Sequence, residues 1–138
     1  MRAVVQRVER ASVSVDGQPV ASIESGLFVL LGIERGDDAA LARRLAAKVS
    51  GLRLFPDDAG RLAEDRGARE ILCVSQFTLL GDTSRGTRPG FGKAAPAGEA
   101  EPIYEEFCTE CGARMGAFGE EMSIDLVLDG PVTVLVDG

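Results

Sequence analysis

Histidine is absent from this 138-residue sequence, and its absence excludes several kinds of active site. Without an imidazole, the chain cannot build a Ser-His-Asp or Cys-His nucleophile arrangement, use histidine as a general base, or form most zinc sites. The sequence contains only three cysteines, an odd number, and shows no export signal. Both features argue against a disulfide framework. We therefore expect no metal and no cofactor, and any chemistry must use other groups.

Long apolar runs and an excess of positive charge are also missing. No segment approaches the roughly 18 consecutive apolar residues that a membrane span needs, and residues 1–10 lack the features of a signal peptide. The 15 Lys and Arg residues against 22 Asp and Glu residues give a net charge of −7. We expect a cytoplasmic protein with no membrane partner, in which any nucleic-acid contact needs a local basic patch.

Apolar residues in strand-like patterns predict a sheet. Valine-rich stretches at 2–8 and 11–15, followed by Asp16-Gly17, predict an opening β-hairpin. The nearly continuous apolar run 27–33 predicts a strand that is buried on both faces and central in the sheet. Three more strands are predicted, at 70–77, 124–128 and 132–136.

Two amphipathic helices are predicted, separated by loops. Residues 38–50 carry apolar positions at helical spacing behind Asp37 or Asp38 as a cap. A second helix is predicted at 98–115, with an apolar stripe of Ile103, Tyr104, Phe107, Cys108, Cys111 and Met115. Because both helix cysteines lie in this stripe, core packing explains them better than a metal or redox pair. Loops are predicted at 56–69 and 81–96, and the whole indicates one α+β domain over residues 1–138.

Two segments carry side chains that could do chemistry. Ser75-Gln76-Phe77-Thr78-Leu79 lies at a predicted strand end and delivers hydroxyls and an amide to a rim, although such residues often only bond to nearby backbone. The loop 81–96 carries Arg85, Arg88 and Lys93, which could bind phosphates or only keep the loop soluble. These residues alone leave both alternatives open.

Two motifs together point to a known family. Ser-Gln-Phe-Thr-Leu at 75–79 and Gly-Pro-Val-Thr at 130–133 resemble the two signature motifs of D-aminoacyl-tRNA deacylases. The opening residues 1–8 and the stretches 88–91 and 101–104 are similar to that family in order and spacing. The resemblance implies a barrel-like core of antiparallel and mixed sheets with two main helices, a homodimer, and an ester hydrolase that removes D-amino acids, and glycine, from tRNA.

The resemblance also implies roles for the first motif. Ser75, Gln76, Phe77 and Thr78 would form the catalytic segment, with backbone N–H groups near Phe77 and Thr78 stabilising negative charge on the ester carbonyl oxygen. The ribose 2′-hydroxyl of the terminal adenosine would help to activate water. A competing version makes Thr78 the nucleophile.

Chirality would be selected by the second motif. A rigid Gly-cisPro step, Gly130-Pro131, would enter the pocket from the partner subunit and exclude L side chains by steric clash. The sequence alone does not set the isomer of this Gly-Pro bond. Arg7 would clamp the Gly-Pro loop, although surface solvation explains it equally well, and Met122 would contribute to substrate binding.

Two departures from the family pattern keep other functions open. Leu128 stands where the family has Asn, and the 61–69 loop is shorter than the usual family segment. Two alternatives therefore accompany the hydrolase: a noncatalytic protein that binds the end of tRNA, and a deacylase with a shifted substrate choice. In each case Arg85, Arg88 and Lys93 are the candidates for contact with tRNA.

Overall fold

The long first strand, β1 (Arg2–Val15), organises the sheet, as the computed structural model of residues 1–138 shows. An Asp16-Gly17 turn, with positive φ at both residues, connects it to β2 (Gln18–Ile23), so the predicted opening hairpin is confirmed. The predicted stretches 2–8 and 11–15 form one continuous strand. The remaining strands of this sheet are β3 (Gly26–Gly32), β6 (Glu70–Ser75), β7 (Arg114–Met115) and β8 (Ser123–Asp137).

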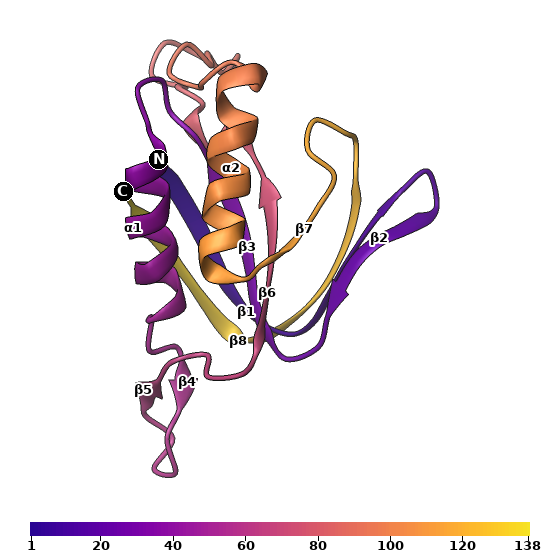
Figure 1. The fold of residues 1–138 in the computed structure, drawn as a ribbon, viewed down its shortest axis with the longest axis vertical. Coiled ribbons are helices and arrows are strands. Elements are labelled where there is room, and N and C mark those ends of the chain that lie inside the picture. Colours follow the sequence, from indigo (N-terminus) through magenta and orange to yellow (C-terminus); the bar gives the residue numbers. More distant parts are fainter.

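The sheet is mixed and nearly closed into a barrel. Its order is β2-β1-β3-β6-β7, and β8 pairs with β1 along almost the whole length of β1. The β1 pairings with β2, β3 and β8 are antiparallel, whereas β3–β6 and β6–β7 are parallel. Figure 1 shows that β2 and the first half of β8 curve away from the two helices. The predicted pair 124–128 and 132–136 is one strand, whose pairing with β1 has two register shifts.

The two helices, α1 (Ala39–Ser50) and α2 (Ala97–Cys111), lie together on one side of the sheet (Figure 1). Asp38 caps α1 by accepting a 2.8 Å hydrogen bond from the Leu41 N–H. Gly112, with a left-handed backbone, ends α2, so Met115 lies on β7 with 45% of its surface exposed. The prediction that the second helix reaches residue 115 was wrong. No helix is long and apolar enough to cross a membrane.

Buried side chains form two clusters, one on each face of β3. Leu27, Val29 and Leu31 pack against the helices, whereas Phe28 joins a smaller cluster inside the curl of the sheet. Successive strand residues point to opposite faces, so the burial of both sets confirms that this strand is central. All three cysteines belong to the larger cluster, and burial raises the pKa of the Cys73 thiol well above its ordinary value. Core packing of the cysteines is confirmed.

The segment predicted as a loop at 56–69 contains a small second sheet, so that prediction was partly wrong. Strands β4 (Phe55–Pro56) and β5 (Leu62–Glu64) pair antiparallel. Asp57 closes the turn between them by accepting hydrogen bonds of 2.9 Å from the N–H groups of Ala59 and Arg61. These bonds lower the pKa of the Asp57 carboxyl. A local side-chain contact therefore organises a stretch that has no apolar period.

Candidate active site

The predicted catalytic segment lies where β6 ends and a short 3-10 helix, η1 (Phe77–Leu80), begins. The strand stops at Ser75, two residues earlier than predicted. The Gln76 N–H still donates to the Leu31 carbonyl of β3 at 2.8 Å, which fixes this point of the chain on the sheet. The Gln76 side-chain amide then donates to the Thr78 hydroxyl oxygen. The sequence thus turns from strand to helix directly at the site.

A cavity of about 530 Å³ opens beside this segment. Ser75, Gln76 and Phe77 line it, together with Met122, whereas Thr78 is exposed next to the lining. The other lining residues are Ile33, Val74, Ala95, Ala97, Ala100, Phe118, Gly119, Glu120 and Ile124. Such a volume suits a small ligand, and the apolar walls suit an uncharged side chain.

Backbone donors are available at one edge of this cavity. A 3-10 helix offers no carbonyl acceptor to the N–H groups of its first residues. In η1 these are the N–H groups of Phe77 and Thr78, since Gln76 N–H bonds to β3 and Leu79 N–H bonds to the Gln76 carbonyl. Two neighbouring amide N–H groups can together stabilise an oxyanion. The arrangement can therefore support acyl transfer without a charged catalytic side chain.

Gly130 and Pro131 lie away from the cavity of their own chain. They do not line it, both residues are exposed on β8, and the peptide bond between them is cis. Gly130 has a φ of +150°, and a Cβ at this position would lie 2.4 Å from the Val132 nitrogen. No other residue fits there without moving the backbone. One chain therefore does not bring the two signature motifs together.

Arg7 is buried and holds the residue that precedes the Gly-Pro step. Its Nε donates to the Asp129 carbonyl oxygen at 3.0 Å and lies 3.1 Å from an Asp129 carboxylate oxygen. Its Nη1 donates to the Leu54 carbonyl oxygen at 2.6 Å. The Arg7 guanidinium also lies over the Phe55 ring, 5.9 Å from its centroid. It clamps Asp129 rather than Gly130 or Pro131, and it is no surface residue.

The loop 81–96 folds back on the catalytic segment. Asp82 and Gly90 exchange backbone hydrogen bonds of 2.8 and 2.9 Å. Phe91 meets Phe77 edge-on, with ring centroids 5.1 Å apart. The loop therefore presents an aromatic pair at the rim of the cavity.

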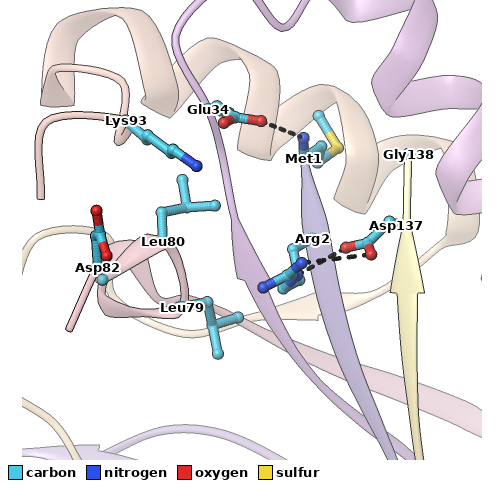
Figure 2. Close-up of a pocket in the computed structure, with 10 residues that line it drawn as sticks. Met1, Arg2, Glu34, Leu79, Leu80, Asp82, Lys93, Asp137 and Gly138 are labelled. Carbon is cyan, nitrogen blue, oxygen red and sulfur yellow. Dashed lines mark hydrogen bonds and ion pairs between the residues drawn. The ribbon is translucent and has the colours of Figure 1, made fainter. Parts of the chain in front are cut away.

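The three basic residues of this loop are all exposed, and none of them lines the first cavity. Arg85 and Arg88 are exposed and form no ion pair. Lys93 instead lines a second cavity, of about 260 Å³, which shares no lining residue with the first (Figure 2). That cavity mixes both charges, since the Met1 ammonium, Arg2, Glu34, Asp82 and Asp137 also line it. Its balance of charge does not favour an anion.

Sequence reasoning named Met122 but missed the contribution of residues 116–121, which precede it. Phe118, Gly119 and Glu120 line the first cavity, although this segment has no apolar period. At Gly116 a Cβ would lie 3.0 Å from both the Met122 sulfur and a Val74 methyl carbon, so a glycine lets Met122 pack close to β6. The paired breakers Gly116 and Gly119 were the only signal that this stretch turns toward the site.

The fold and the cavity define a class: a small α+β protein with an apolar pocket beside a short 3-10 helix whose first N–H groups have no backbone acceptor. The family model described as D-Tyr-tRNA(Tyr) deacylase matches residues 4–137, and the chain belongs to this family. A D-aminoacyl-tRNA deacylase from Anaeromyxobacter dehalogenans is 51% identical over 146 residues and covers 99% of this chain and 97% of its own. One from Symbiobacterium thermophilum is 49% identical, with coverage of 99% and 95%.

Two solved structures share the fold. A c-Myc DNA unwinding element binding protein superposes with a TM-score of 0.93 at 37% identity and covers 100% of this chain and 99% of its own. A probable eukaryotic D-amino acid tRNA deacylase has a TM-score of 0.84 at 14% identity, with coverage of 98% and 97%. The predicted barrel-like α+β fold with two main helices is confirmed.

Proposed function

We propose that the protein hydrolyses the ester bond of D-aminoacyl-tRNA, and of glycyl-tRNA, and releases the free amino acid and tRNA. The observation that carries this proposal is the apolar cavity lined by Phe77, next to the unpartnered N–H groups of Phe77 and Thr78, in a chain of the deacylase family. The cavity takes the amino-acid side chain, and the N–H groups receive the ester carbonyl oxygen.

Water is the attacking group in this proposal. Its oxygen forms a bond to the carbonyl carbon while the carbonyl oxygen gains charge against the two N–H groups. The bond to the ribose 3′-oxygen then breaks, and the proton from water is transferred to that oxygen, with the ribose 2′-hydroxyl assisting. Thr78 is a poor nucleophile here, because its oxygen accepts a hydrogen bond from Gln76 and no histidine is available as a base. Positioning therefore replaces a side-chain base.

Rejection of L-amino acids is assigned to Gly130 and Pro131 of a second copy of the chain. The exposed position of this step, outside the cavity of its own chain, supports a site completed in trans. A backbone wall excludes an L side chain by steric clash and leaves room for hydrogen or a D side chain. Arg7 and Asp129 position this step, and Met122 forms part of the acyl-binding wall.

Contact with tRNA is assigned to the loop 81–96. Arg85 and Arg88 are exposed and unpaired, so they can reach phosphates close to the aromatic pair at the cavity rim. Lys93, which lines the second cavity, is the third basic residue of this contact. Because the chain carries a net charge of −7, this contact depends on local charge rather than on the charge of the whole protein.

The test is to incubate the protein with D-tyrosyl-tRNA, L-tyrosyl-tRNA and glycyl-tRNA in EDTA and to follow loss of the ester. We expect loss of the D-tyrosyl and glycyl esters and survival of the L-tyrosyl ester. Thr78→Ala retains at least about a tenth of the rate if water attacks, whereas a catalytic nucleophile contributes several orders of magnitude. Binding without cleavage of any ester would instead support the noncatalytic alternative, and cleavage of the L ester a shifted substrate choice.

A further inference from the structure

Glu120 is the only charged side chain among the residues that line the apolar cavity. It lies in the turn that follows Phe118 and Gly119, where Gly119 has a φ of +75°. It is exposed, and no basic group lies within ion-pair distance of its carboxylate. An unpaired carboxylate beside an apolar wall is a feature that the proposed hydrolysis does not use.

We propose that Glu120 binds the free α-ammonium group of the aminoacyl ester and so makes the enzyme prefer substrates with an unblocked amine. This inference rests on the proposed function, because it uses the same cavity for the acyl group. An aminoacyl-tRNA carries many phosphates but only one cation at its acyl end, the ammonium on the α-carbon. A carboxylate at this cavity repels the phosphates and attracts that ammonium.

The geometry places the two recognition elements in one cavity. Phe77, at the start of η1, lines the cavity and Thr78 follows it, whereas Glu120 lines the cavity from the segment after β7. The α-carbon is one bond from the ester carbon, so its ammonium stays inside the cavity when the carbonyl oxygen meets Phe77 and Thr78. N-acylation removes the charge and replaces it with a bulky amide. Glu120 therefore determines specificity without taking part in bond cleavage.

The variant that tests this role is Glu120→Gln, with Glu121→Gln as a matched control. Glu121 is the neighbouring exposed acid and does not line the cavity. The substrates are D-tyrosyl-tRNA and N-acetyl-D-tyrosyl-tRNA. For Glu120→Gln we expect kcat/KM on the free-amine substrate to fall about tenfold, mainly through KM, as befits one charge-assisted contact. On the N-acetyl substrate both variants should match the wild type within about twofold.

A pH series gives a second readout that a purely structural role would not move. An α-amino group of a peptide titrates at about 7.7 to 8.0, so the substrate ammonium is lost in this range. The wild-type KM should rise above about pH 8, whereas the KM of Glu120→Gln should stay nearly flat. No other titratable side chain lines the cavity, and the nearest acids along the segment, Glu121 and Asp125, are exposed outside it.

Each outcome separates this inference from the proposed function. Hydrolysis of D-tyrosyl-tRNA by the wild type, with an unchanged Glu120→Gln, would overturn the role of Glu120 alone. Equal losses on both substrates would also overturn it, because they would mark a structural role. A wild type that leaves D-tyrosyl-tRNA intact would overturn the proposed hydrolysis and this inference with it.

Discussion

Arg7 is the only buried residue of the chain that carries a charged side chain, and its partners explain why burial is tolerated. Its guanidinium forms bonds to the carbonyl oxygens of Leu54 and Asp129 and an ion pair to the Asp129 carboxylate. A buried charge is stable only when such partners satisfy it. Arg7 thereby holds Asp129, the residue that precedes Gly130, in place. The residue links the β4–β5 segment to the Gly-Pro step.

Replacing Arg7 tests this link. Arg7→Ala should lower the free energy of unfolding by about 2–3 kcal/mol, because two carbonyl oxygens and a carboxylate lose a charged donor. Arg7→Lys should lose less, since it keeps the charge but not the planar fork. Urea unfolding followed by circular dichroism measures both changes. Arg10→Ala, an exposed arginine of the same strand, is the control and should stay within about 0.5 kcal/mol of the wild type. Equal stability of the two alanine variants would contradict the clamp.

The loop 81–96 is the element that the fold holds against the catalytic segment. Its only aromatic anchor is the Phe77–Phe91 pair, and the backbone pair between Asp82 and Gly90 shapes the stretch between them. A Cβ at Gly81 would lie 3.1 Å from the Phe91 ring, so the absence of a side chain at this position leaves room for the ring. The position of Arg85 and Arg88 relative to the cavity therefore depends on this pair.

Phe91→Ala should release the loop without unfolding the protein. An aromatic pair contributes about 1 kcal/mol beyond its buried area, so we expect KM for D-tyrosyl-tRNA to rise about fivefold with kcat changed less than twofold. Phe91→Leu keeps part of the packing, so its KM should lie between the KM values of the wild type and Phe91→Ala. Leu62→Ala, which removes another exposed apolar side chain far from the site, is the control. A loss of kcat in Phe91→Ala with KM unchanged would show that the loop acts on chemistry instead.

The sequence predicts an element correctly where neighbouring residues determine its beginning and its end. The first helix begins as predicted because Asp38 caps it within one turn, and the apolar run at 27–33 is buried on both faces as expected. The apolar spacing continues past Gly112 to Met115 and therefore predicts a second helix that is too long. In the structure this helix ends at Gly112. A spacing rule does not include this stop.

The residues of the candidate site also differ in whether neighbouring residues or tertiary contacts determine their position. The predicted strand end placed Ser75, Gln76 and Phe77 at a rim, and the structure shows that they line the cavity, whereas their catalytic role was implied only by the family resemblance. The wall formed by Phe118 and Glu120 depends on how a segment without periodicity folds over β6, and this is decided by tertiary contacts. The glycines at 116 and 119 signal a turn in this segment, but they do not specify which residues form the wall.

At the scale of the whole molecule, one face of the sheet carries an apolar row that the helices do not cover. Leu30 of β3, Val4 of β1 and Leu135 of β8 lie directly opposite one another on adjacent strands. Their neighbours Ala3, Val5 and Val136 instead pack on the helices. Leu135 is 68% exposed, the largest value among the large apolar side chains. A two-fold interface would place this row against the same row of a second copy.

Leu135→Glu tests the homodimer and the site in trans together. A carboxylate at the most exposed position of this apolar row would have to be buried against the second copy, so its desolvation opposes assembly. We expect a dimer for the wild type and a folded monomer for Leu135→Glu, measured by size-exclusion chromatography with light scattering. Deacylation of D-tyrosyl-tRNA should fall at least about tenfold in the monomer, because Gly130 and Pro131 then no longer reach a partner cavity. Val20→Glu, an equally apolar but separate exposed position on β2, should keep both mass and activity. A fully active monomer would show that each chain forms a complete site alone, and the wall that rejects L-amino acids would have to be sought within one subunit.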